Sequence, residues 1–415
     1  MLRKIVGTLG TNLGIMLIQV IVLLMTTQLL GQEGRGEISL FVLNVSILVT
    51  ISSLFGGVSL VYMTPKVGTE KLILPSYVWG VISISVTSSI LILFDLINTD
   101  LFIHLILIGF IRVGYTINSY LILGKNNVKA FNLLNFIEAI LLLTVFFYLI
   151  FIKKDVNYIS YIYATYISVG VPFFISCFIL KSKIEVKTNV LKPIIKEVFR
   201  YGFVIQSGTL AATITNRFSF FLLDKFLSVA SVGFFSTGLT VGEKIQIVPK
   251  SLSSVQYAHI SNSNERDATS ISKLFMRISF LATFLILFIV LILPSEFYEL
   301  IIGKDFSGIK ELLVYLSPGI LIFSVNGILT HYFSGIGNFA INTKAAFITM
   351  VLTIVICSIL IPIYGIYGAV ISTVSSYAVS TLFLLYQFNK EEKLRLKDIV
   401  FSMKDVRKLK ELVKK

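Results

Sequence analysis

Residues 101 to 123 read LFIHLILIGFIRVGYTINSYLIL, an apolar run with an arginine, Arg112, at its centre. About 20 apolar residues are enough to cross the hydrocarbon core of a bilayer as a helix, so this run is long enough to span a membrane. A charged side chain near the midplane costs roughly 2.5–3.5 kcal/mol on insertion scales. We therefore expect Arg112 to meet a polar partner inside a helix bundle.

The composition of the whole chain agrees with a membrane protein. The 415 residues are 55% hydrophobic and only 14% charged, and the mean hydropathy is +0.88. Soluble globular domains carry about 25% charged residues. Because helices satisfy their own backbone hydrogen bonds in lipid, the sequence predicts an all-α integral membrane protein.

Apolar runs of spanning length recur along the chain. The first contains GIMLIQVIVLLMTTQLL and lacks a following cleavage site, which favours a retained helix over a signal peptide. We predict twelve transmembrane helices, near residues 12–30, 38–62, 76–94, 101–123, 130–152, 158–180, 201–223, 230–257, 274–293, 312–334, 341–361 and 365–388.

The basic residues give the orientation. Lys and Arg total 36, of which 26 fall in the segments that face the cytoplasm if the N-terminus does, and six fall in the opposite loops. Cytoplasmic loops carry the excess of positive charge in membrane proteins. We therefore predict that both termini face the cytoplasm.

The net charge of +14 has its largest contribution from the tail, residues 389–415. Its apolar residues recur at helical spacing, so we predict contact with the anionic inner leaflet, to which each basic residue contributes about 1 kcal/mol of attraction. A solvated tail is the alternative. Nucleic-acid binding is not expected.

The longest cytoplasmic loop divides the predicted helices into six and six. The predicted organisation is an N-terminal lobe (1–180), a cytoplasmic linker (181–200), a C-terminal lobe (201–388) and the basic tail (389–415). Short glycine-containing turns recur in both halves, which is typical of transporters built from parallel repeats around a central cavity.

Motifs of enzymes are missing from the sequence. We find no glycine-rich phosphate loop and no nucleophile elbow. The three histidines, His104, His259 and His331, are too widely spaced to predict a metal site. We therefore expect no catalytic residues, no cofactor and no metal.

Three stretches resemble a known family. They are LLGQEGRGEISLFVLNVSILVTISSLFGGVSLVY (29–62), NRFSFFLLDKFLSVASVGFFSTGLTVGEKIQIVPKSLSSVQYAHIS (216–261) and IPIYGIYGAVISTVSSYAV (361–379). They are similar to polysaccharide biosynthesis proteins, the O-antigen and capsule flippases of the multidrug/oligosaccharidyl-lipid/polysaccharide exporter (MOP) superfamily. The resemblance extends over nearly the whole chain in helix number and order.

That resemblance implies two six-helix lobes around a central cavity and a flippase activity. The implied cargo is an undecaprenyl-pyrophosphate-linked oligosaccharide, carried across the cytoplasmic (inner) membrane of a bacterium by alternating access. The implied partners are this lipid-linked oligosaccharide, membrane lipids, and a polysaccharide polymerase with other assembly proteins.

An anionic cargo requires cations inside the membrane. Arg112, Arg217 and Lys244 are the predicted substrate-binding residues, because guanidinium groups suit phosphate oxygens and the family pattern favours a base in the eighth helix. Arg112 could instead form a structural ion pair, and Arg217 could reach outward to the membrane surface.

Two acidic residues lie within predicted helices. Glu138 could neutralise Arg112 or relay a proton, and Glu243 is likewise a candidate for an ion pair or a proton relay. Embedded amides could bind sugar hydroxyls or join helices; they are Gln19, Asn44, Asn118, Gln206, Gln246 and Asn326.

Two other functions remain open on the sequence. A drug/cation antiporter of the multidrug and toxic-compound extrusion branch would use embedded acids, but the first helix has none and the embedded charges are mainly basic. A non-transporting membrane scaffold for cell-wall assembly is the other alternative.

Overall fold

A computed structural model of the protein describes residues 2–181, 188–260 and 265–392. Nine helical segments within these residues are long and apolar enough to cross a membrane, which indicates a multi-pass membrane protein. The predicted number of twelve crossings and the cytoplasmic position of the termini stay predictions. Most of the predicted basic tail, residues 393–415, lies outside the described residues, as does 182–187 of the predicted linker.

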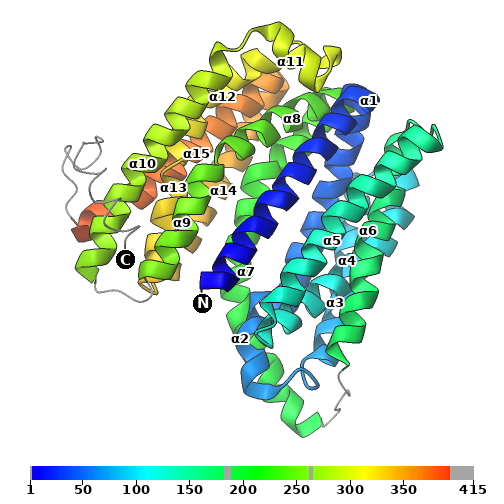
Figure 1. Cartoon of the computed structure of the whole chain (residues 1–415), viewed down its shortest axis with the longest axis vertical. Helices are drawn as coiled ribbons and strands as arrows, with labels where there is room; N and C mark the ends of the chain where they lie inside the picture. Colours follow the sequence, from blue (N-terminus) through cyan, green and yellow to red (C-terminus); the bar gives the residue numbers. More distant parts are fainter. Residues whose placement is uncertain (1, 182–187, 261–264, 393–415) are drawn as a thin grey trace. The chain divides into compact units, whose positions relative to one another are not determined.

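The described chain forms two compact units (Figure 1). The first unit contains residues 1–213, 228–234 and 301–305, and the second contains the remainder. Helices of the first unit are α1 (Leu2–Gly56), α2 (Val58–Val67), α3 (Ile73–Leu93), α4 (Thr99–Gly124), α5 (Val128–Phe147) with a π-helical end (Tyr148–Ile152), and α6 (Tyr158–Leu180). Helix α4 packs against α1, α3 and α6, which places it at the centre of this unit.

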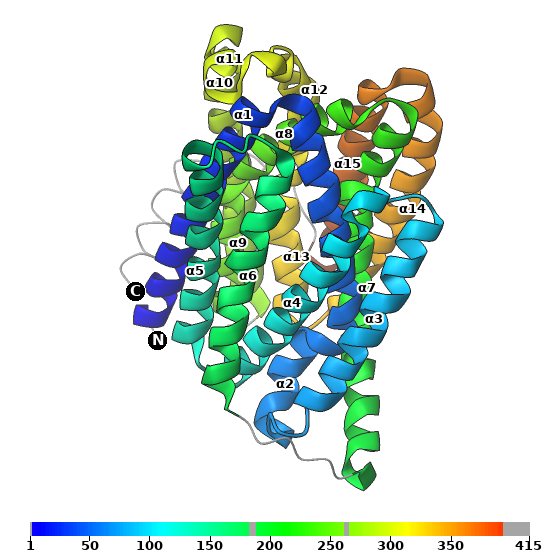
Figure 2. The same cartoon turned by 90° about the vertical axis from the view of Figure 1, so that its right-hand side faces the viewer.

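Helix α1 contains the first predicted helix, 12–30, and most of the second, 38–62, whose last residues fall in α2. Gly31 leaves the helical conformation, with φ 64° and ψ −165°. In Figures 1 and 2 the dark-blue helix α1 turns back on itself. The glycine is needed because side-chain-bearing residues rarely adopt positive φ. The predicted loop between helices is thus replaced by a break at one residue.

Helix α7 (Thr188–Phe226) contributes its first part to the first unit and its second part to the other. Residues 188–200, which we predicted as linker, are helical. High charge keeps such a segment out of the hydrocarbon but does not prevent a helix, and its apolar spacing is amphipathic. Phe199 packs edge-on against Trp79 of α3, with ring centroids 5.4 Å apart, and Val198 is fully buried.

The second unit contains most of α8 (Val229–Ile245) and the helices that follow it, except for residues 301–305, which belong to the first unit. These helices are α9 (Ile247–Ile260), α10 (Glu265–Ile292), α11 (Ser295–Ile302), α12 (Ile309–Phe323), α13 (Asn326–Gly335), α14 (Phe339–Tyr364) and α15 (Ile366–Glu392). A short 3-10 turn (Lys304–Phe306) has its first two residues in the first unit. Helices α14 and α15 pack along each other, and α9 packs against α10 and α13.

Each unit has its own apolar core. In the first, α1, α3, α4 and α6 meet around fully buried leucines such as Leu48, Leu105 and Leu121. In the second, α9, α10, α13 and α15 meet around Ile328 and Phe388. Large apolar side chains are also exposed along most helices, as expected of surfaces that face lipid.

Candidate functional site

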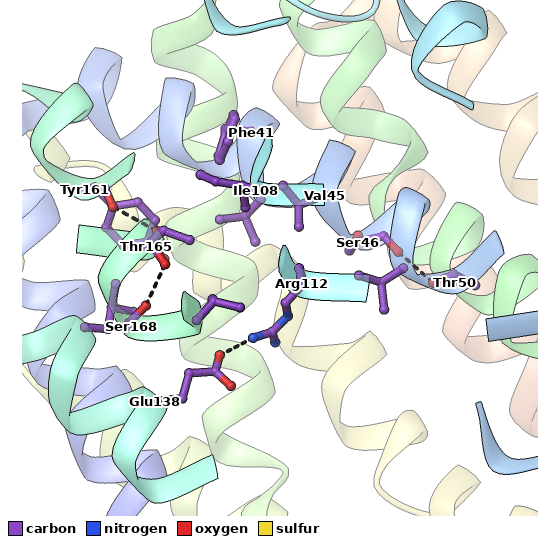
Figure 3. A pocket seen from close by; sticks show the side chains of 14 residues that line it. Phe41, Val45, Ser46, Thr50, Ile108, Arg112, Glu138, Tyr161, Thr165 and Ser168 are labelled. Atoms are coloured by element: carbon purple, nitrogen blue, oxygen red, sulfur yellow. Dashed lines mark hydrogen bonds and ion pairs between the residues drawn. The ribbon is translucent and has the colours of Figure 1, made fainter. Parts of the chain in front are cut away.

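A cavity of about 280 Å³ lies inside the first unit, between α1, α4, α5 and α6 (Figure 3). Apolar side chains form most of its wall, and each of the four helices also contributes at least one polar side chain. Its lining residues are Phe41, Val42, Val45, Ser46, Val49, Thr50, Ile108, Arg112, Glu138, Leu142, Tyr161, Thr165, Ser168 and Val169.

Arg112 enters this cavity from the middle of α4. Figure 3 shows its guanidinium group directed at Glu138 of α5, and Arg112 Nη1 donates a hydrogen bond to Glu138 Oε1. The Arg112 and Glu138 side chains keep 32% and 22% of their surface accessible, so the pair is reachable from the cavity. The Tyr115 ring lies beside the guanidinium group, 5.9 Å from its carbon to the ring centroid.

Four serine and threonine side chains line the cavity, and each donates to its own helix backbone. Ser46 Oγ donates to Leu43 O at 2.7 Å and Thr50 Oγ1 to Ser46 O at 2.8 Å. On α6, Thr165 Oγ1 donates to Tyr161 O at 2.8 Å and Ser168 Oγ to Thr165 O at 3.1 Å. Since a hydroxyl has one hydrogen, these oxygens offer lone pairs to a ligand and act as acceptors.

The second unit contains a similar ion pair. Arg217 Nη2 of α7 donates to Glu243 Oε1 of α8 at 2.7 Å. The Phe220 ring lies beside this guanidinium group, 5.2 Å from its carbon to the ring centroid. The structure therefore pairs Arg217 with a carboxylate; the prediction that it also binds cargo stays a prediction.

Lys244 follows Glu243 in the last turn of α8 and is half-buried. It belongs to the second unit, whereas Arg112 belongs to the first. Cargo binding by Lys244, Arg112 and Arg217 and a proton relay through Glu138 or Glu243 remain predictions.

The embedded amides mostly join helices. Asn118 of α4 accepts from Tyr77 Oη at 2.9 Å and donates to Ser176 Oγ of α6 at 2.9 Å. Asn44, Gln246 and Asn326 make comparable bonds, to Leu96 O, Ile320 O and Ser380 Oγ. Asn118 and Asn326 thus join neighbouring helices, which was one of the two roles expected for these amides. Asn44 of α1 binds the turn between α3 and α4, and Gln246, between α8 and α9, binds α12.

The sequence reasoning missed two parts of the site. The hydroxyl side chains of the cavity gave no signal, because serine and threonine occur throughout membrane helices. The partner of Arg217 could have been found from spacing: each glutamate follows its arginine by 26 residues, and an aromatic residue follows each arginine by three.

No family model matches the chain. The probable low-salt glycan biosynthesis flippase Agl15 of Haloferax volcanii is 21% identical over 205 residues, which are 48% of this chain and 43% of that protein. The match thus spans less than half of either protein.

Solved structures are similar over nearly the whole chain. An inward-facing multidrug resistance MATE family transporter of the MOP superfamily superposes with a TM-score of 0.74 at 15% identity, covering 92% of this chain and 96% of that one. The lipid II flippase MurJ in an inward closed conformation gives a TM-score of 0.73 at 15% identity, covering 96% and 89%. The chain therefore has the all-helical fold of the MOP-superfamily transporters. The two six-helix lobes around a central cavity, which the resemblance to polysaccharide flippases implied, stay a prediction.

Proposed function

We propose that this protein is a flippase that moves an undecaprenyl-pyrophosphate-linked oligosaccharide across the cytoplasmic membrane of a bacterium by alternating access. The observation that carries the proposal is the cavity of the first unit, which joins an embedded guanidinium group to a set of acceptor hydroxyls. The similarity to a glycan biosynthesis flippase and to the fold of a lipid II flippase supports the same class of cargo.

The charge of Arg112 suits the pyrophosphate. A guanidinium group is always protonated and presents a planar fork that two phosphate oxygens can engage together. In a cavity walled mostly by apolar side chains, such a charge-assisted contact is stronger than it would be at the protein surface. Arg112 is thus the residue on which we expect headgroup binding to depend most.

The hydroxyl oxygens suit a sugar. Ser46, Thr50, Thr165 and Ser168 use their hydrogens on the helix backbone, and sugar hydroxyls can donate to the oxygens that remain. The cavity volume of about 280 Å³ is near the lower end of ligand pockets, roughly 300–1,000 Å³. It can hold the phosphates or a first sugar, and a whole oligosaccharide would extend beyond it.

The experiment is a leaflet assay for lipid-linked oligosaccharide in cells. Cells lacking the protein should accumulate the oligosaccharide on the cytoplasmic face, and cells carrying Arg112→Gln at matched expression should do the same. Lys153→Gln, which neutralises an exposed lysine after the π-helical end of α5, is the matched control and should behave as wild type.

The double variant Arg112→Gln/Glu138→Gln leaves no unpaired carboxylate and should also accumulate cargo, which separates lost binding from misfolding. Accumulation in the deletion strain alone would support the proposed flippase function but would show that transport does not require Arg112. No accumulation in any strain would contradict the flippase and favour the antiporter or the scaffold.

A further inference from the structure

The two embedded arginines are held in the same way. Arg112 and Arg217 each contact one carboxylate oxygen through one terminal nitrogen, from a glutamate on the next helix along the chain. Each also has an aromatic ring beside it, Tyr115 and Phe220 respectively. The same arrangement is present in both compact units, which indicates a common physical requirement.

That requirement is charge neutrality in a membrane. An unpaired arginine at the helix centre is expensive, whereas a guanidinium–carboxylate pair has no net charge. A flippase passes through each conformational change twice, once loaded and once empty. When the cavity is empty, an internal carboxylate supplies the negative charge that cargo phosphates supply when it is full.

The pair is also suited to exchange. A single nitrogen–oxygen contact joins Arg112 to Glu138, whereas a phosphate group can engage the guanidinium fork through two contacts. Both side chains line the cavity and keep part of their surface accessible, so an incoming anion can reach them without unfolding the unit.

We propose that Glu138 is an exchangeable counter-ion, which pairs with Arg112 when the cavity is empty and is displaced from it by the anionic headgroup. This inference rests on the proposed function and adds a specificity-determining residue to it. Glu138 opposes binding, so only a ligand whose negative charge outcompetes one carboxylate is accepted. A neutral lipid alcohol has no negative charge to pair with Arg112 and gains no affinity from it. A diphosphate gains more affinity than a monophosphate because it carries more negative charge.

Binding to the purified full-length protein tests the exchange. The probes are farnesyl diphosphate, farnesyl monophosphate and farnesol, and the measured quantity is Kd for each in a lipid nanodisc. Wild type should bind them in that order of affinity. Glu138→Gln should bind farnesyl diphosphate about tenfold more tightly, equivalent to about 1.4 kcal/mol, and should discriminate less between the two phosphates.

Three further variants make the result specific. Arg112→Gln should lose at least tenfold in affinity for farnesyl diphosphate. Glu138→Asp keeps the charge but shortens the side chain, and should fall between wild type and Glu138→Gln. Glu296→Gln makes the same chemical change at an exposed residue of α11 and should leave every Kd unchanged.

Transport gives the second readout. Glu138→Gln should bind cargo more tightly yet export it more slowly, because release and empty return then leave Arg112 without a counter-ion. Tighter binding with slower export is a combination that simple structural damage does not produce.

The inference fails if Glu138→Gln weakens diphosphate binding, since the glutamate would then position the arginine. It also fails if Kd is unchanged. Either result leaves the flippase intact as long as cells lacking the protein still accumulate cargo on the cytoplasmic face. If that accumulation is missing, the proposed function itself is wrong.

Discussion

Arg112 and Arg217 each bring a permanent charge into an apolar bundle, and each is compensated locally. The compensation has two parts: a carboxylate on an adjacent helix and an aromatic ring whose face attracts the cation. Because removing one member of an embedded pair strands the other, the members should be coupled in stability.

The Arg217–Glu243 pair allows a direct measurement of this coupling. We expect Arg217→Gln and Glu243→Gln to lower the thermal stability of the detergent-purified protein, and the double variant to be more stable than the sum of the two losses predicts. Both side chains are partly accessible, so a coupling energy of about 1 kcal/mol is expected. Additive losses would show that the two residues act independently.

From the sequence we predict a candidate partner for Arg112 but none for Arg217. Its position in an apolar run required a polar partner, and Glu138 could be named as a candidate from the sequence. Arg217 lies near the end of a predicted helix, so the sequence allowed it either to bind cargo or to reach outward to the membrane surface. The structure pairs it with Glu243. The choice depended on how α7 and α8 pack, which the sequence does not state.

At the scale of helices, breaks occur where the backbone cannot continue. Gly31 interrupts α1 with a positive φ. Helix α8 ends at Ile245, four residues before Pro249, where the proline ring would clash with the helical carbonyl. Pro172 and Pro318 lie inside α6 and α12, which continue past them.

A substitution at Gly31 tests whether the turn within α1 depends on the glycine. A Cβ atom there would lie 2.7 Å from Asp305 Oδ2, and the φ of 64° is strained for alanine. Gly31→Ala should therefore destabilise the protein by roughly 1–3 kcal/mol, seen as a lower melting temperature and lower yield.

The matched control is Gly170→Ala, inside α6. A Cβ atom at Gly170 meets nothing within 4 Å, and alanine favours a helix over glycine by about 1 kcal/mol. This variant should be neutral or stabilising. Equal melting temperatures for the two variants would show that the turn in α1 does not depend on the glycine.

At the scale of the molecule, the first unit is not formed by the first half of the chain alone. Residues 228–234 and 301–305 belong to it. Gln28 Nε2 donates to Ile301 O at 2.6 Å, and Gln32 Nε2 donates to Asp305 O. The start of α7 adds a close backbone approach, because a Cβ at Gly202 would overlap Leu54 O.

The first half of the chain should therefore depend on the second for stability. We expect a fragment of residues 1–187 to be recovered in low yield by itself. Co-expression with residues 188–415 should raise the yield, and the two fragments should co-purify. Gly202→Ala in the second fragment should weaken the co-purification, whereas Lys225→Ala, at an exposed residue of the same helix, should not. A fragment 1–187 that is equally stable alone would contradict this expectation.

The sequence by itself determined that this is a helical membrane protein with charges placed inside the membrane. Those conclusions follow from the length of the apolar runs and from the energy of a charge in hydrocarbon, which are local properties of the chain. The tertiary structure decided which carboxylate meets which arginine, where helices break, and which hydroxyls share a cavity with Arg112. These depend on the placement of residues far apart in the chain, such as Ser46 and Thr165, which line one cavity because whole helices pack around it.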